Sequence, residues 1–402
     1  MSSTLAANAL IEPFKVEIPQ DRLDWISARV AAYPWPTPGA PGWSEGWEYG
    51  VGLEKLRSLC RYWLDHYDWR TWEAKLNAFP QFIAKVPGGD IHCYIEQGSG
   101  PAPTPLLLLH GWPGSVFEFL HLIEPLAHPE RFGGSVEDAF TVIVPSLPGY
   151  GFSACPDHPV GPREVARRMA ALMEDVLGFD GYLVQGGDWG ALIGSWMGYE
   201  APGCRGLHLN LMGWDAPGQA FVTEEEQAYA ARRAAIADDG LGYAHEQRTR
   251  PQTLSVAMRD SPVGVCAWIL EKFHGWSDIR EGFDRIYSED QLLTNVMLYL
   301  ATDTFNSAAW LYKGRDIERF GDAAPPGARI EVPTAIANFP KEFIPFPPRS
   351  FVERAINVVR WTDFTVGGHF PALERPDELR DDIRAFASQL RTQAGGASGK
   401  LG

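Results

Sequence analysis

Hydrophobic residues in the N-terminal part of the chain recur at helical spacing. Leu23, Ile26 and Val30 follow intervals of three and four, which is the pattern of one apolar helix face. A second such run covers 56–64, and the stretch between the two, 33–52, is rich in Pro, Gly and Trp. These patterns predict two helices joined by a long irregular segment, with no strand in this part of the chain.

The pattern changes at Gln81, where residues typical of strands begin. Runs over 81–86 and 91–96 flank the turn Pro87-Gly-Gly-Asp90, which predicts a hairpin. Beyond the hairpin, short apolar runs alternate with segments of helical spacing. The predicted strands are 106–109, 141–144, 182–185, 206–210, 334–337 and 358–362, and the predicted helices are 116–126, 163–177, 192–199 and 377–390. Such alternation predicts an α/β fold with a mostly parallel sheet and helices on both faces.

The alternation is interrupted between Trp214 and Pro333. Helical patterns such as 288–299 and 306–314 fill this interval. A helical insertion predicts a lid over the carboxyl ends of the strands, where ligands bind in open α/β sheets. We therefore expect a helical extension wrapping the core over 1–80, an α/β core over 81–213 and 333–391, a helical lid over 214–332 and a flexible tail over 392–402.

Composition narrows the classes of partner. Of the 402 residues, 45% are hydrophobic and 21% are charged, so a sizeable core is possible and global disorder is ruled out. The 51 acidic residues outnumber the 35 basic ones and give a formal net charge of −16. Because an acidic chain repels phosphate groups, this charge argues against nucleic acid and anionic membranes as main partners.

Cysteine usage and the N-terminal residues bear on location. The five cysteines are scattered and none forms a C-x-x-C pair, so neither a disulfide framework nor a zinc ribbon is indicated, and a reducing cytoplasm is favoured. Residues 1–13 lack the features of a signal peptide, and the longest strongly aliphatic run is far shorter than the ~20 residues of a membrane span. We expect a soluble, cytoplasmic protein that binds no metal.

The string Gly186-Gly-Asp-Trp-Gly190 follows a predicted strand and precedes a helix. This Gly-x-Asp-x-Gly arrangement is that of a nucleophile elbow, with Asp188 where many hydrolases carry Ser. The flanking positions must lack bulk because the nucleophile lies on a strained turn. An ionised Asp at this turn attacks carbon directly. The alternative is an ordinary loop in which Asp188 only caps the helix.

The string His110-Gly-Trp-Pro-Gly-Ser115 directly follows the predicted strand 106–109. In the same arrangement this loop supplies a backbone N–H to an oxyanion hole, here that of Trp112, and the N–H of Trp189 supplies the other. A cis bond before Pro113 would re-aim the Trp112 amide. His110 itself fits a structural role better than a catalytic one, and an ordinary Gly/Pro turn is the alternative for the whole string.

A histidine and a carboxylate complete the predicted site. His369 lies on a Gly-rich loop after the last predicted strand, where a triad carries its general base. Its acid should follow a strand between the lid and this loop. Glu342 fits best, while Asp363 and Asp215 stay as alternatives. Without a role in catalysis, each of these would be an ordinary loop or surface residue.

Several strings along the chain together resemble one family. They are His110-Gly-Trp-Pro-Gly-Ser115, Pro145-Ser-Leu-Pro-Gly-Tyr-Gly-Phe-Ser153, Gly186-Gly-Asp-Trp-Gly190, Asp260-Ser-Pro-Val-Gly264 with Ile269-Leu-Glu-Lys-Phe273, and Gly367-Gly-His-Phe370. None of them alone is specific, but jointly they resemble the epoxide hydrolases of the α/β-hydrolase fold, in the microsomal-type branch with a helical N-terminal extension. The likeness runs from about Ile11 to about Phe386.

The resemblance implies a two-step conversion of an epoxide and water to a vicinal diol without a cofactor. Asp188 opens the ring and forms a covalent ester, while two lid tyrosines, Tyr243 and Tyr312 by family alignment, protonate the alkoxide. His369, oriented by Glu342, then activates the water that hydrolyses the ester. Sequence logic alone does not select these two from the 13 tyrosines, and lid packing is the alternative role for each.

Departures from the family and rival chemistries remain. We expect the protein to be without the N-terminal membrane anchor of microsomal members. Asp303 stands in a string where relatives are rich in Trp, Thr and Gly. Asp303 either alters the polarity of the pocket or faces solvent.

A haloalkane dehalogenase would need N–H donors for halide, and a non-catalytic binding protein would be expected to lose its nucleophile or base. We expect a bulky aryl epoxide and a role in natural-product biosynthesis. A homodimer contact through 34–47 is an open alternative.

Overall fold

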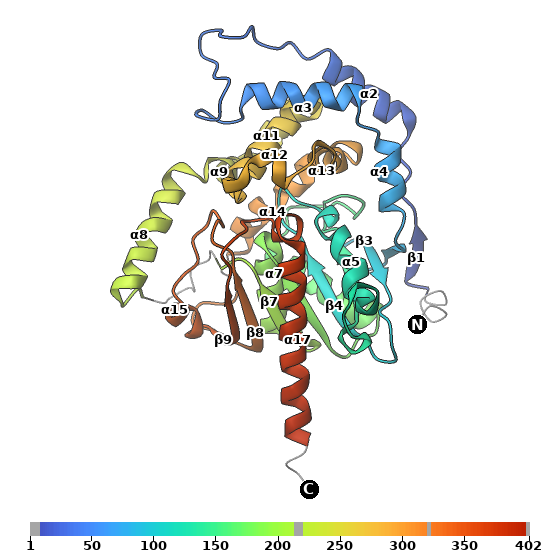
Figure 1. Cartoon of the computed structure of the whole chain (residues 1–402), viewed down its shortest axis with the longest axis vertical. Coiled ribbons are helices and arrows are strands. Elements are labelled where there is room, and N and C mark those ends of the chain that lie inside the picture. The colour runs from blue at the N-terminus through green and yellow to red at the C-terminus, as the bar shows by residue number, and fades with distance from the viewer. Residues whose placement is uncertain (1–8, 213–219, 320–322, 399–402) are drawn as a thin grey trace.

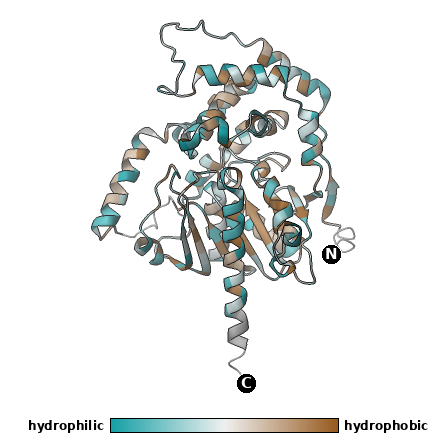
Figure 2. Cartoon of the chain, viewed as in Figure 1, coloured by the Kyte–Doolittle hydropathy of each residue, from teal (hydrophilic) through white to brown (hydrophobic). Residues whose placement is uncertain are grey.

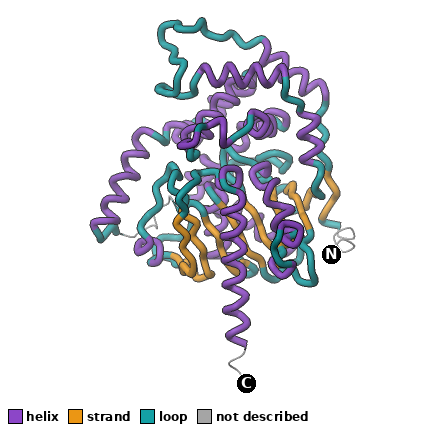
Figure 3. The backbone as a smooth tube through the Cα atoms, in the orientation of Figure 1, coloured by secondary structure: helices purple, strands orange, loops and turns teal. Residues whose placement is uncertain are grey.

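The computed structural model describes residues 9–212, 220–319 and 323–398 of the chain. Its strands form a single sheet, with helices on both sides (Figures 1 and 3). In order across the sheet they are β1 (Ile11–Phe14), β2 (Gln81–Ala84), β3 (Ile91–Glu96), β5 (Phe140–Pro145), β4 (Thr104–Leu109), β6 (Tyr182–Gly186), β7 (Cys204–Leu209), β8 (Ile330–Asn338) and β9 (Ile356–Asp363). From β5 to β9 the strands are parallel, so their carboxyl ends share one edge of the sheet.

Strand β1 corrects the prediction that the N-terminal part has no strand. It pairs antiparallel with β2, with Ile11 opposite Ala84 and Phe14 opposite Gln81. The strand has only four residues, one of them Pro13, and such a run gives no visible alternation. Proline is tolerated there because β1 is an edge strand, whose outer side needs no ladder hydrogen bonds.

Helices cover both faces of the sheet. α5 (Leu120–Ala127) packs against α17 (Pro376–Ser398) on one face, and α6 (Pro162–Ala171) packs against α7 (Asp188–Glu200) on the other. β4 connects to β5 through α5 in one direction across the sheet, and β5 connects back to β6 through α6 in the other direction. Right-handed crossovers therefore place α5 and α6 on opposite faces. Strands β4 and β5 are almost wholly buried between the two layers, and the strands appear predominantly brown, hence hydrophobic, in Figure 2.

Two predicted helices have different ends in the structure. α17 continues to Ser398, whereas the sequence predicted an end at 390 and a flexible tail from 392. No proline follows within this stretch, and each glycine costs a helix only about 1 kcal/mol, which is too little to end it by itself. The predicted helix 163–177 is α6 followed by a π-helical turn, Leu172–Val176.

A helical layer lies between the sheet and the N-terminal extension. Its main helices are α9 (Gly242–Thr249), α10 (Pro251–Asp260), α11 (Pro262–Trp276), α12 (Phe283–Ile286), α13 (Glu289–Ala301) and α14 (Phe305–Glu318), whereas α8 (Glu224–Asp239) lies at the side of the molecule (Figure 1). The extension crosses over this layer with α2 (Gln20–Ala31), α3 (Leu53–Asp65) and α4 (Trp69–Leu76), of which α2 and α3 contact α11 and α13 (Figure 1). On this basis we propose the division into extension, core and lid given above. Among the described helices, none has the length and apolar character that a membrane crossing requires.

Candidate active site

The turn between β6 and α7 holds Asp188 in a left-handed conformation, with φ of +47°. Two glycines make this turn possible. A Cβ on Gly186 would lie 2.3 Å from the carbonyl oxygen of Gly190, and a Cβ on Gly190 would lie 2.1 Å from that of Leu109. Both distances are impossible for a real side chain, so the Gly-x-Asp-x-Gly pattern is a steric requirement of this turn.

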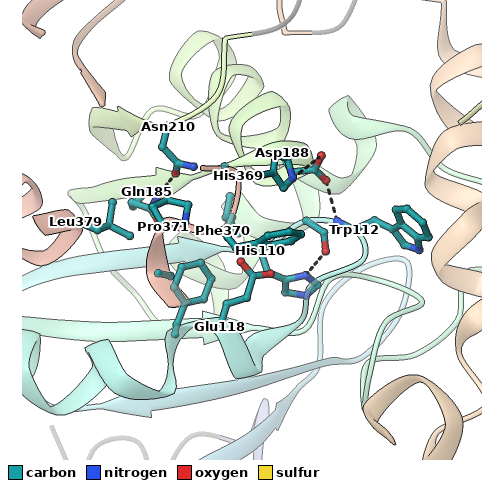
Figure 4. A pocket seen from close by; sticks show the side chains of 15 residues that line it. His110, Trp112, Glu118, Gln185, Asp188, Asn210, His369, Phe370, Pro371 and Leu379 are labelled. Atoms are coloured by element: carbon teal, nitrogen blue, oxygen red, sulfur yellow. Dashed lines mark hydrogen bonds and ion pairs between the residues drawn. The ribbon is translucent and has the colours of Figure 1, made fainter. Parts of the chain in front are cut away.

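Two backbone N–H groups converge on the Asp188 carboxylate. Trp112 N–H donates to Oδ1 at 2.8 Å, and the N–H of Trp189 is hydrogen-bonded to the same side chain. Burial raises the pKa of Asp188 above its ordinary value, while His369 and the two N–H groups act in the opposite direction. In Figure 4 the Trp112 nitrogen faces Asp188 and its indole points away. The peptide bond between Trp112 and Pro113 is cis.

His369 connects Asp188 to Glu342. Its Nε2 lies 3.5 Å from Asp188 Oδ2, and its Nδ1 lies 2.8 and 2.9 Å from the two carboxylate oxygens of Glu342. Burial opposes a charge on the imidazole, but Glu342, Asp188 and Glu118 outweigh it and raise the pKa of His369 to about 9. The backbone N–H of His369 also donates to the carbonyl of Trp276 in the lid at 2.9 Å.

Of the three candidate acids, Glu342 is the one that contacts His369. Asp363 is exposed at the end of β9, where it accepts hydrogen bonds from Asn338 and Trp361. Asp215 lies outside the described residues. The loops of the acid and the histidine are held together because Lys341 N–H donates to the carbonyl of Gly367 at 3.1 Å.

Tyr243 of α9 and Tyr312 of α14 line the same cavity as Asp188. This cavity has a volume of about 570 Å³. The two phenol rings meet edge to face at 5.9 Å, and each packs against a tryptophan, Tyr243 on Trp112 and Tyr312 on Trp189. Burial raises the pKa of both phenols well above the ordinary range, and the Asp188 carboxylate adds to this. Both tyrosines are therefore protonated donors at neutral pH.

Sequence reasoning missed Glu118, a buried carboxyl group beside the site. Glu118, His369 and Asp188 line a second, small cavity of about 20 Å³ (Figure 4), which is room for one water molecule. Burial raises the pKa of Glu118 to about 8. A Cβ on Gly114 would lie 1.5 Å from its Oε1, so the glycine leaves space for this side chain. The available signal was an acidic residue inside the apolar run 116–120.

Two residues singled out from the sequence have no contact with the reactive groups. His110 donates from Nδ1 to the carbonyl of Gly111 and accepts from Leu147 N–H at Nε2, and burial lowers its pKa to about 4. These contacts agree with a structural role. Asp303 is exposed and forms an ion pair with Arg259 at 2.9 Å, at a different cavity.

Potential metal ligands are dispersed. Within the described ranges, no group of three or more His, Cys, Asp or Glu side chains is arranged to hold a metal ion.

Comparison with known proteins places these features in a family. The chain matches the family model described as epoxide hydrolase N terminus over residues 11–119, and the alpha/beta hydrolase fold over 104–230. It is 33% identical to epoxide hydrolase 1 of Sus scrofa over 96% of this chain and 91% of that protein. A provisionally named epoxide hydrolase of Stigmatella aurantiaca is 38% identical over 95% of this chain and 86% of its own. The solved structure of Aspergillus niger epoxide hydrolase superposes with a TM-score of 0.83 at 34% identity, covering 96% of this chain and 98% of that one.

Proposed function

Since this chain belongs to the epoxide hydrolases, which have an α/β-hydrolase core, we propose that it converts an epoxide and water to a vicinal diol through a covalent ester on Asp188. The observation that carries this mechanism is the convergence of Asp188, Tyr243 and Tyr312 on one cavity of about 570 Å³. A carboxylate nucleophile and two phenol donors supply what ring opening requires, which is attack at carbon and a proton for the oxygen.

In the first step, a carboxylate oxygen of Asp188 attacks a ring carbon as the carbon–oxygen bond of the epoxide breaks. The epoxide oxygen takes a proton from Tyr243 or Tyr312, so no free alkoxide leaves. The high pKa of both phenols supports this role, because each is protonated before the reaction. The products of this step are a neutral alkyl ester and a negative charge on the tyrosine pair.

In the second step, His369 removes a proton from water, which attacks the ester carbonyl of Asp188. Forming the ester removes the Asp188 charge that helped to raise the pKa of His369, so the imidazole becomes a more suitable base only after ring opening. The small cavity beside Glu118 supports a position for this water. The Trp112 and Trp189 N–H groups then stabilise the oxyanion. When the oxyanion collapses, the bond between the Asp188 carbonyl carbon and the alkyl oxygen breaks, and the departing alkoxide takes the proton that His369 removed from water. Proton transfer from the Asp188 carboxylic acid to the tyrosinate restores both groups as the diol leaves.

The size and lining of the large cavity bear on the substrate. Its wall includes the apolar side chains of Trp189, Leu192, Leu211 and Ile344, and also charged ones such as Arg233, Arg248 and Arg315. The volume and the apolar part of the wall support a bulky aryl-substituted epoxide. A role in natural-product biosynthesis and a cytoplasmic location stay predictions. A homodimer through the segment 34–47 also stays a prediction, supported by the exposed side chain of Trp43.

Haloalkane dehalogenation is the second candidate. The indole N–H of Trp112 is buried without a partner among the described residues, and such donors hold a leaving halide. The Trp189 side chain, in contrast, is hydrogen-bonded to Tyr312. The indole of Trp112, however, points away from Asp188 (Figure 4). A panel of aryl epoxides and haloalkanes, assayed for diol and for halide, separates the two activities. Halide without diol would favour the dehalogenase, and neither product would favour a binding protein.

A single turnover in heavy-oxygen water, with enzyme in excess, tests the ester mechanism. The ester route transfers an unlabelled Asp188 oxygen to the diol, so the label enters the Asp188 carboxylate and not the first product. Direct attack of water on the epoxide would give the opposite result, a labelled diol and an unlabelled enzyme.

A further inference from the structure

Lys272 on α11 is a buried cation that the mechanism above does not use. Its side chain is 10% exposed and forms an ion pair with the neighbouring Glu271. Lysine is among the residues least often buried, because an ammonium group loses strong hydration in the interior. A buried lysine at this position, within Ile269-Leu-Glu-Lys-Phe273, therefore needs a contact that compensates for the lost hydration.

The ammonium group of Lys272 lies against Tyr243. Its Nζ is 4.6 Å from the centroid of the Tyr243 ring and 5.8 Å from that of Trp276, one helical turn further along α11. The Tyr243 ring is fixed by further aromatic contacts. Trp112 stacks on it at 5.1 Å and Trp276 packs at 5.1 Å. The cation is thus held at the ring by rigid neighbours within a desolvated part of the lid.

Charge moves toward this ring during ring opening. The bond from Asp188 to carbon forms, the epoxide carbon–oxygen bond breaks, and the phenol proton passes to that oxygen. The electron pair left behind makes the donor a phenolate. A cation at the face of an aromatic ring stabilises negative charge on that ring more strongly than it stabilises the neutral phenol.

The other charged groups around Tyr243 act against the phenolate. Asp188 on α7, Glu342 after β8 and Glu271 on α11 all raise the pKa of Tyr243, after burial as the largest cause, while the phenol of Tyr312 on α14 lowers it. Arg233, Asp238, His245, Arg248 and Arg315 line the wider cavity. Among the residues that the structure describes, Lys272 is the cation that lies at the Tyr243 ring itself.

We propose that Lys272 is a positioning residue that stabilises negative charge on Tyr243 as this phenol protonates the epoxide oxygen. The proposal rests on the proposed function of Tyr243 and deepens it. It makes Tyr243, rather than Tyr312, the phenol that gives up its proton. Lys272 itself does not touch the substrate.

Single-turnover formation of the Asp188 ester from styrene oxide tests this proposal. Lys272→Met should slow ester formation about 30-fold, which equals about 2 kcal/mol, the value of a desolvated cation–ring contact. KM should change little, and Lys272→Arg should restore most of the rate. The matched control is Lys75→Met, which removes a lysine 3.6 Å from the Trp72 ring in the extension and should leave the rate unchanged. If Lys272→Met does not fold, as judged by thermal unfolding, Lys272→Gln takes its place.

A double-mutant cycle separates a charge effect from a loss of packing. In a Tyr243→Phe background Lys272→Met should add almost nothing, whereas in a Tyr312→Phe background it should keep its full effect. An unchanged rate in Lys272→Met, or an equal loss with and without the Tyr243 hydroxyl, would overturn the proposal. If the unmodified enzyme forms no ester on Asp188, the proposed function fails. If it forms the ester and Lys272→Met forms it equally fast, only the inference about Lys272 fails.

Discussion

The sheet edge and the lid hold their reactive groups in different ways. At the sheet edge, Asp188 is fixed by a backbone turn that only glycine neighbours permit. In the lid, Tyr243 and Tyr312 are fixed by ring packing between helices. Backbone constraints leave a short signature in the sequence, and packing between distant helices does not. In the proposed mechanism the two regions also divide the reaction, because the lid tyrosines would act in ring opening and the sheet edge would act in both steps.

The largest expected effect is at the sheet edge. Asp188→Ala removes the nucleophile, so we expect diol formation to fall at least about 10⁵-fold, to the level without enzyme. The measurement is diol release from styrene oxide, with thermal unfolding to verify the fold. Activity within tenfold of the unmodified enzyme would reject Asp188 as the nucleophile.

His369→Gln should separate the two steps. Loss of the base should slow ester hydrolysis about 10⁴-fold while ring opening continues. Rapid mixing should then show one fast burst of epoxide consumption, equal to the enzyme present, followed by almost no turnover. Loss of the burst itself would mean that His369 is needed in the first step and that the division between the regions is wrong.

Glu342→Gln should have a smaller effect of the same kind, about 10²-fold on ester hydrolysis, because the imidazole keeps its place but loses its orienting charge. Glu342 raises the pKa of His369, so its neutralisation lowers that pKa, and the rising limb of the pH–rate profile should move to lower pH. Asp363→Asn is the control and should change neither quantity. If Asp363→Asn slowed ester hydrolysis and Glu342→Gln did not, Asp363 would be the acid.

The lid is tested by Tyr243→Phe and Tyr312→Phe. Each removes one hydrogen-bond donor to the epoxide oxygen and should slow ring opening about 10- to 100-fold, with ester hydrolysis much less affected. Single-turnover ester formation is the measurement, and Tyr199→Phe, an exposed tyrosine on α7, is the control. If neither lid variant slows ring opening, the tyrosines only pack the lid.

The smallest effects concern stability and compare one glycine from each region. Gly190→Ala introduces a Cβ 2.1 Å from the Leu109 carbonyl, whereas Gly275→Ala in α11 meets only the Glu271 side chain at 3.8 Å. We expect Gly190→Ala to lower the free energy of unfolding by about 2 kcal/mol or more. Gly275→Ala should raise it by up to about 1 kcal/mol, because alanine favours a helix. If urea unfolding gave the same change in the free energy of unfolding for both variants, the turn would be no more constrained than the lid helix.

The same contrast explains what could be predicted from the sequence. Asp188 and His369 follow from glycine-rich strings after predicted strands, and Trp112 follows from the loop after β4. Tyr243 and Tyr312 came only from family resemblance, since any amphipathic helix presents tyrosines of this kind. Glu118 was missed because its apolar neighbours conceal that it is buried beside the site.

Errors in the fold had equally physical causes. The edge strand β1 is too short and too exposed to show alternation, and α17 passes two glycines that do not end it. The alternation of strands and helices, by contrast, predicted the parallel sheet because its central strands β4, β5, β6 and β7 are largely buried. Packing on both faces imposes an apolar composition on such strands.

The most direct test of the mechanism is peptide mapping by mass spectrometry of His369→Gln after mixing with styrene oxide. The ester mechanism predicts a mass increase of one substrate molecule on the peptide that contains Asp188, and none in the same variant carrying Asp188→Ala. An adduct on another residue, or diol formed at the normal rate with no adduct at any time, would contradict it.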